Sequence, residues 1–145
     1  MSLKRVSLVA TAFLVVATLS LLLRRSLFAR GPIWIGVQVA AGALMLWARL
    51  TFRGRSFHAG ADPTPGGLVT TGPYRLVRHP IYAAILLFLW AGVASNGTIL
   101  SLLTAIVATA ATIVRLGAEE VLVSEYYPEY TEYARRTKRL IPFVL

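Results

Sequence analysis

The chain has 145 residues, of which 57% are hydrophobic and only 14% are charged, and its formal net charge at pH 7 is +9. Soluble domains usually contain about 25% charged residues, so this composition excludes an ordinary water-soluble protein and indicates one integral membrane domain. The chain has no cysteine, which excludes disulfides, thiolate metal ligands and thiol nucleophiles within it, and we expect no metal site.

Three runs without charge mark the expected membrane spans. Residues 6–23 and 31–48 contain 18 residues each, and residues 80–114 contain 35. A helix needs roughly 20 apolar residues to cross a bilayer, so the third run is long enough for two crossings, divided at the turn-forming triplet Ser95-Asn96-Gly97. We therefore expect an all-α fold with four membrane helices in a single domain over residues 1–145. Their approximate ranges are 6–23, 31–48, 80–95 and 98–115.

The first run could also be a signal peptide, because Lys4 and Arg5 precede it. It is long for the apolar part of such a peptide and ends in Arg24-Arg25 in place of a cleavage site with small residues. We therefore interpret it as a span.

The basic residues predict the orientation. Four spans place both termini and the loop between the second and third spans on one side of the membrane. The opposite side holds only Arg24, Arg25 and Arg30, so the positive-inside rule predicts cytoplasmic termini in a multi-pass protein of the cell membrane. The twelve basic residues on the predicted cytoplasmic side are Lys4, Arg5, Arg49, Arg53, Arg55, Arg75, Arg78, Arg115, Arg135, Arg136, Lys138 and Arg139.

This distribution also bears on partners. The basic residues are spread along the membrane edges, which favours contact with anionic lipid headgroups and argues against nucleic acid as a partner. The sequence does not indicate an oligomeric state.

The loop between the second and third spans contains a dense polar segment. Residues 53–67 are rich in glycine and proline and predict irregular chain, whereas Leu68 to Tyr82 carries more reactive side chains. Pro80 suits the first turn of the third helix, so Arg78 and His79 would lie at its positive end, where they favour an anion. Alternatively, the arginines are interfacial anchors and His79 caps the helix. Taken alone, these residues favour the second interpretation.

The C-terminal part contains most of the acids of the chain. Arg115 lies four residues before Glu119, so the two predict a helical ion pair. Glu120 points about 100° further around the helix and needs another partner. The five acids that fall within fourteen residues are Glu119, Glu120, Glu125, Glu129 and Glu132.

Tyrosines follow these acids. Pro128 predicts the start of an interfacial helix that runs to about Arg139. Tyrosines with basic residues are typical of any amphipathic helix at a headgroup boundary, yet carboxylates and aromatic faces also suit a bound organic cation. The four tyrosines are Tyr126, Tyr127, Tyr130 and Tyr133.

The two polar segments must meet on one side of the membrane and combine an anion site with a cation site. This combination fits S-adenosylmethionine, which has a carboxylate, an ammonium and a sulfonium. The sequence between Leu68 and Pro142 resembles the superfamily of isoprenylcysteine carboxyl methyltransferases and phospholipid methyltransferases. The resemblance rests on residues 68–74, Arg78-His79-Pro80-Ile81-Tyr82, Glu119-Glu120, residues 127–133 and Ile141-Pro142.

The resemblance implies a cofactor and roles for particular residues. The acceptor would be lipophilic and arrive from the bilayer, either an isoprenylcysteine-like carboxylate or a phospholipid amine, and an amine would need a base such as Glu120 or a tyrosinate. We expect catalytic roles for Glu120, Tyr130 and Arg135. The wall near the acceptor would contain Tyr130, Tyr133 and Arg135 or Arg136. The residues expected to bind S-adenosylmethionine are Tyr74, Arg78, His79, Pro80, Tyr82, Glu119 and Glu120.

The chain departs from the superfamily at Ala84, where members often have glycine, and at Tyr127, often phenylalanine. It also has four expected spans where some members have five or more. Two other functions remain open. A sterol-reductase-like enzyme would use NADPH with a similar Arg-His segment, and a small membrane protein with a degenerate pocket would have no activity. Cofactor-binding assays distinguish the reductase from a methyltransferase. The joint presence of the Arg-His and Glu-Glu motifs argues against a protein without activity.

Overall fold

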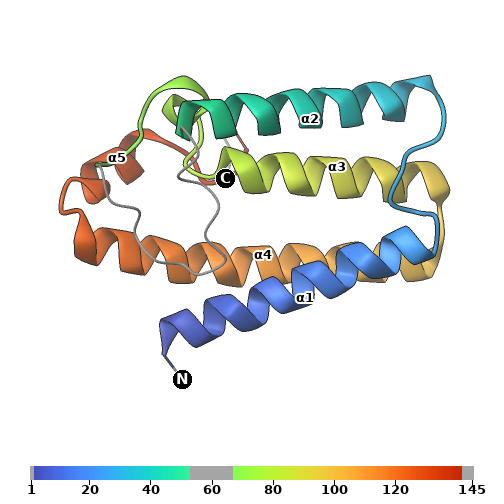
Figure 1. The fold of residues 1–145 in the computed structure, drawn as a ribbon, viewed down its shortest axis with the longest axis horizontal. Coiled ribbons are helices and arrows are strands. Elements are labelled where there is room, and N and C mark those ends of the chain that lie inside the picture. Colours follow the sequence, from blue (N-terminus) through green and yellow to red (C-terminus); the bar gives the residue numbers. More distant parts are fainter. Residues whose placement is uncertain (1, 53–66, 142–145) are drawn as a thin grey trace.

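A computed structural model describes residues 2–52 and 67–141. Four helices lie side by side, and a short 3-10 turn, η1 (Gly72–Arg75), and a short fifth helix lie at one end of them (Figure 1). The expected all-α fold is confirmed, since the described residues contain helices and one isolated bridge. The helices are α1 (Leu3–Leu23), α2 (Pro32–Phe52), α3 (Pro80–Asn96), α4 (Ile99–Tyr126) and α5 (Tyr130–Arg136).

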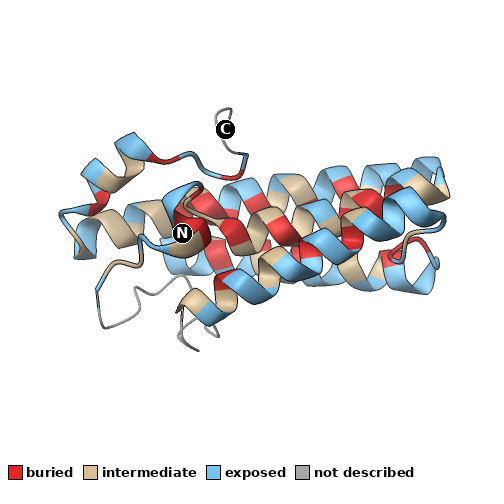
Figure 2. Cartoon of the chain, turned by 90° about the horizontal axis from the view of Figure 1, so that it is seen from above, coloured by how far each residue is buried: buried red, intermediate tan, exposed pale blue. Residues whose placement is uncertain are grey.

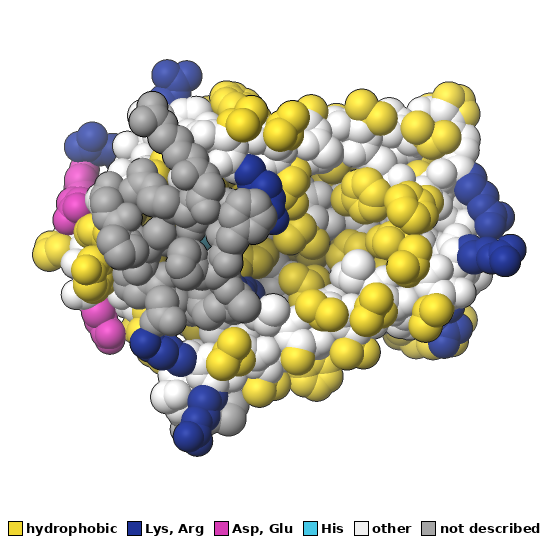
Figure 3. Space-filling model, in the orientation of Figure 1, with side chains coloured by type: hydrophobic (Ala, Val, Ile, Leu, Met, Phe, Trp, Pro, Cys, Tyr) yellow, Lys and Arg dark blue, Asp and Glu magenta, His cyan; other side chains and the backbone are white. Residues whose placement is uncertain are grey.

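The long helices have the surface of a membrane protein. By length and composition, α1, α2 and α4 can each cross a membrane, while α3 is an apolar helix of 17 residues. Large apolar side chains are exposed along them, such as Val16 at 63% and Val39 at 68%. In Figure 3 the basic side chains gather toward the two ends and apolar side chains cover the surface between. This surface is stable against lipid and unfavourable against water.

The helices pack in the order α2, α3, α4, α1 (Figure 1). Residues with small side chains line the contact between α1 and α4, including Ser7, Ala10 and Ala17 on one side and Ala105 and Ala108 on the other. Small side chains let helix backbones approach closely in a bilayer, where dispersion contacts and polar bonds replace hydrophobic burial. Figure 2 shows the buried residues on the helix faces that meet one another.

The connection between α1 and α2 is held against α3. The Gln38 side chain of α2 donates hydrogen bonds to the carbonyls of Leu27 (2.8 Å) and Phe88 (3.0 Å) and accepts one from the Ala29 N–H (2.9 Å). A Cβ added at Gly92 of α3 would lie only 2.2 Å from the Leu27 carbonyl oxygen. The absence of a side chain at Gly92 therefore permits this close approach.

Some element ends differ from the sequence prediction. The turn after α3 is where the triplet predicts it, with Gly97 in the left-handed region at φ +61°. However, α4 continues to Tyr126, so Arg115, Glu119 and Glu120 all lie on it. The fifth helix ends at Arg136 and not near Arg139, because the chain becomes extended at Thr137 (φ −123°, ψ 155°).

The extended chain after α5 pairs with the segment that precedes α3. Val77 and Lys138 form a parallel bridge, and the N–H groups of Arg78 and His79 donate to the carbonyls of Lys138 (2.7 Å) and Arg139 (3.0 Å). The expected meeting of the two polar segments at one end is thus observed (Figure 1). The predictions for residues 53–66, including Arg53 and Arg55, and for Pro142 lie outside the described residues.

Replacing Gly92 with alanine should destabilise the protein. The added methyl group must push the Leu27 carbonyl away, and overpacking of this kind costs about 1–3 kcal/mol of unfolding free energy. Thermal unfolding in detergent measures the effect. Gly42→Ala is the control, because nothing lies within 4 Å of a Cβ at that position of α2. Equal melting temperatures for the two variants contradict the prediction.

Candidate functional site

The centre of the polar end is the carboxylate of Glu120 on α4. Arg78 Nε donates to Glu120 Oε1 at 3.0 Å, and His79 Nε2 lies 3.2 Å from the same oxygen. Arg139 donates to Oε2 from Nε (3.0 Å) and Nη2 (2.9 Å). Three basic side chains from two distant segments thus surround one carboxylate, which is the partner set that Glu120 requires. We call these four residues the Glu120 cluster.

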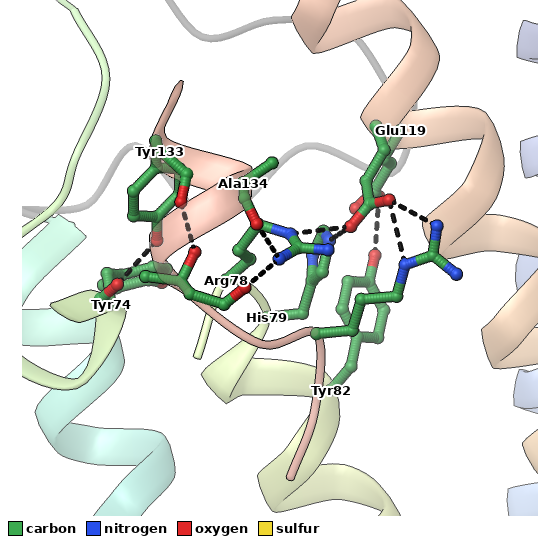
Figure 4. A network of polar contacts seen from close by, with 10 residues as sticks. Tyr74, Arg78, His79, Tyr82, Glu119, Tyr133 and Ala134 are labelled. Atoms are coloured by element: carbon green, nitrogen blue, oxygen red, sulfur yellow. Dashed lines mark hydrogen bonds and ion pairs between the residues drawn. The ribbon is translucent and has the colours of Figure 1, made fainter. Parts of the chain in front are cut away.

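The local backbone explains how Arg78 and His79 reach this carboxylate. Pro80 is buried in the first turn of α3, and His79 is its N-cap residue. The His79 side chain makes no capping hydrogen bond and contacts Glu120, so the interpretation of His79 as a mere helix cap is wrong. Arg78 Nη1 also donates to the carbonyls of Ala134 (3.0 Å) and Thr137. Figure 4 shows this arginine between α4 and the end of α5.

The neighbouring carboxylate, Glu119, has different partners. Tyr82 donates its hydroxyl hydrogen to Glu119 Oε1 at 2.6 Å (Figure 4). Arg115 Nη2 lies 3.0 Å from the same oxygen. Arg115 Nε in turn donates to the Tyr82 hydroxyl oxygen. The expected ion pair between Arg115 and Glu119 is present. The two adjacent acids therefore point to different sides of α4, with Glu119 toward the middle of the helix bundle.

Tyrosines form the wall between η1 and α5. Tyr133 donates its hydroxyl hydrogen to the Tyr74 carbonyl at 2.6 Å, and its ring centroid lies 5.9 Å from that of Tyr130. The Tyr74 hydroxyl is buried and has no hydrogen-bond partner among the described residues. Burial raises the pKa of Tyr133 to about 12 and raises the pKa values of Tyr74 and Tyr130 further above their usual value. All three are therefore neutral phenols at physiological pH.

A surface hollow of about 530 Å³ adjoins this wall and includes Tyr133. Arg135, which is a predicted site residue, does not reach Glu119 or Glu120. It is exposed and lies 3.8 Å from Glu132, while Arg136 pairs with the same acid at 2.7 Å. The other residues of the hollow are Leu68, Thr70, Arg75, Glu129, Glu132, Arg136 and Thr137.

The structure thus brings together most of the predicted site residues and adds one. The Glu120 cluster contains the predicted residues Arg78, His79 and Glu120, and Tyr82 contacts Glu119 beside it. Sequence reasoning missed Arg139. Helical periodicity could not identify it, because the chain is extended there. The sequence contains one signal for Arg139, which is its position after the acids and shortly before Ile141-Pro142. The described residues hold no group of three possible metal-binding side chains.

Comparisons with known proteins place these residues in a family. The family model described as phospholipid methyltransferase matches residues 31–130, which include Arg78, His79, Tyr82, Glu119 and Glu120. The chain is also similar to two curated proteins. The cobalt-zinc-cadmium resistance protein CzcN of Cupriavidus metallidurans is 34% identical over 113 residues, which cover 74% of this chain and 46% of the relative.

The second relative is the nickel-cobalt-cadmium resistance protein NccN of Alcaligenes xylosoxydans xylosoxydans, 33% identical over 102 residues, or 67% of this chain and 42% of the relative. The matched region is thus less than half the length of either relative. No solved structure matches the chain. The family match covers most of the chain and includes both the Arg-His and the Glu-Glu motif, so the expected resemblance is confirmed. The chain therefore belongs to the phospholipid methyltransferase family of membrane proteins.

Proposed function

We propose that this protein is a methyltransferase that uses S-adenosylmethionine to methylate a lipophilic acceptor at the membrane. The observation that carries the proposal is the contact of Arg78 and His79 with Glu120, at 3.0 and 3.2 Å. This contact joins the start of α3 to the end of α4, and it unites the two motifs of the family in one place. Tyr82 and Glu119 extend the same site toward the bilayer.

The residues present fit the charges of this cofactor. A zwitterion can insert its carboxylate toward Arg78, His79 or Arg139 and its ammonium toward a glutamate, so that it exchanges existing ion pairs and leaves no charge unpaired. The buried hydroxyl of Tyr74 has no partner among the described residues and is available to a ligand. These features support the assignment of the predicted cofactor-binding residues.

The cofactor would supply an electrophilic methyl group, and the residues of this chain would bind and orient it and exclude water. Both oxygens of Glu120 already accept hydrogen bonds from basic groups, so Glu120 is arranged as an anchor. The raised pKa of Tyr130 favours a phenol that donates a hydrogen bond over a tyrosinate base. A carboxylate acceptor needs no base, whereas an amine requires one. The catalytic roles of Glu120, Tyr130 and Arg135 stay predictions.

The names of the two relatives suggest a connection with resistance to metal ions. We propose that any such role of this protein acts through methylation of a membrane component, as its membership of the phospholipid methyltransferase family suggests. NADPH in place of S-adenosylmethionine is the alternative cofactor. Binding of the two cofactors by the purified protein, measured side by side, distinguishes the two enzymes.

Removing the charge at the centre of the Glu120 cluster should weaken cofactor binding. Glu120→Gln leaves three basic groups without their anion, and His79→Ala removes one of those groups. We expect each to lower the affinity for S-adenosylmethionine by at least about tenfold, since charge-assisted hydrogen bonds are lost. Calorimetric titration of the detergent-solubilised protein measures this affinity.

The matched control is Glu125→Gln, which changes an exposed acid of the same helix. It should bind the cofactor as the unaltered chain does. Methyl-labelled cofactor with a lipid extract then identifies the acceptor as the labelled species. Unchanged affinity in both Glu120→Gln and His79→Ala removes the assignment of the site.

Tyrosine titration tests the environment of the wall between η1 and α5. The pKa of Tyr133 is raised to about 12 in the folded protein from an ordinary value near 10, so burial stabilises the fold below pH 10. This contribution is lost as the pH rises from 10 to 12. Absorbance near 295 nm should show that Tyr133→Phe removes a group that titrates near pH 12. Loss of a group that titrates near pH 10 in Tyr133→Phe contradicts the structure.

The predicted orientation is testable because the chain has no cysteine of its own. Ser2→Cys and Arg24→Cys introduce single thiols at exposed positions near opposite ends of α1. We expect a membrane-impermeant maleimide to label Ser2→Cys in inverted vesicles and Arg24→Cys in right-side-out vesicles, as the positive-inside rule requires. The opposite labelling pattern reverses the orientation and puts the site outside the cytoplasm.

A further inference from the structure

Arg115 lies inside the helix bundle, where α1, α3 and α4 meet. The sequence places it near the membrane edge of the fourth span, yet the whole residue is only 5% exposed. It points its Nη1 toward α1, where it donates to the Thr11 hydroxyl oxygen and lies 3.5 Å from the Ser7 carbonyl oxygen. Its Nε and Nη2 point toward Tyr82 and Glu119. One guanidinium therefore bridges α1 and one side of the candidate site.

The partners of this guanidinium divide into two kinds. Glu119 supplies the negative charge, at 3.0 Å, while the α1 groups are neutral oxygens that accept hydrogen bonds. A buried guanidinium is stable only when its donors have acceptors on every side. Loss of the α1 acceptors would remove the contacts of Nη1 with α1, and the guanidinium would then shift relative to Glu119 and Tyr82.

Such a movement would disturb Glu119 and Tyr82 directly. Glu119 Oε1 accepts from both Tyr82 and Arg115, and the Tyr82 hydroxyl oxygen accepts from Arg115 Nε. The Arg115 guanidinium carbon also lies 5.7 Å from the centroid of the Tyr82 ring. Each of the three side chains therefore contacts the other two, so that a shift of one changes the contacts of both others.

We propose that Arg115 is a positioning residue through which α1 sets the orientation of Glu119 and Tyr82 in the cofactor site. The proposal rests on the proposed function for its consequence, which is a change in affinity for S-adenosylmethionine. The family model matches residues 31–130, and α1 ends before them at Leu23. A helix outside the family match thus contributes to the site through Arg115.

Thr11→Val tests this role, because it removes the hydroxyl acceptor and keeps the shape of the side chain. Thr18→Val is a matched control on the same helix. Both threonines are half-buried, and each donates to the backbone carbonyl four residues earlier at 2.8 Å. Only Thr11 accepts from Arg115 in the contacts described above. Thr11→Ser keeps the hydroxyl and serves as the rescue variant.

We expect Thr11→Val to weaken binding of S-adenosylmethionine by about tenfold in calorimetric titration, near the lower end of the range for loss of one hydrogen bond to a charged group. Thr18→Val and Thr11→Ser should stay within about twofold of the unaltered chain. Equal affinities of Thr11→Val and Thr18→Val overturn the proposal. A loss in Thr11→Val that serine does not restore also overturns it, since the hydroxyl is then not the cause.

A second measurement separates this inference from the proposed function. Thermal unfolding of Thr11→Val, Glu119→Gln and the double variant gives a double-mutant cycle that needs no cofactor. If Thr11 positions Glu119 through Arg115, the double variant loses less melting temperature than the sum of the two single losses. A loss equal to or larger than the sum overturns the proposal. If the unaltered chain binds no S-adenosylmethionine but the cycle gives the smaller loss, the proposed function fails and the structural coupling stands.

Discussion

The ion pairs of Glu120 hold together parts of the chain that otherwise have no reason to meet. A carboxylate at the edge of the bilayer is unfavourable unless basic groups surround it, and its own helix supplies none on that side. Arg78 and His79 come from the start of α3, and Arg139 comes from the chain after α5. The cost of burying this one charge is therefore offset only when both segments fold over the end of α4.

Arg78 connects this charge to the end of the fifth helix. Its Nη1 donates to the carbonyls of Ala134 and Thr137, which lie in and just after the last turn of α5. The final carbonyls of a helix have no partner within the helix, and a cation near them is favourable. The same guanidinium thus pairs with Glu120 and donates to the last carbonyls of α5. Beyond α5 the chain is extended and pairs with residues 76–79. This pairing brings Arg139 back to Glu120.

The sequence predicted those parts of the structure that depend on neighbours along the chain. The four longest helices follow from uncharged runs, the turn at Gly97 from its flexible triplet, and the contact of Arg115 with Glu119 from helical spacing. The need of Glu120 for a partner other than Arg115 was also predicted, because its side chain points about 100° away from that of Glu119 around the helix. The identity of the partners was not fully predictable. Arg139 reaches Glu120 only through backbone pairing between distant segments, which leaves no periodic pattern in the sequence.

Arg115 shows a different limit of sequence reasoning. Its place among the basic residues predicted to be cytoplasmic followed from the end of the uncharged run. However, a long side chain on a helix can point back toward the N-terminal turn and into the bundle. Two polar groups of α1, at Ser7 and Thr11, make that direction favourable.

The consecutive acids therefore belong to different environments. Glu119 contacts side chains of α3 and α4. Glu120 contacts basic side chains from the segments just before α3 and after α5. Because both acids lie on one turn of α4, a single helical turn joins the two sets of contacts.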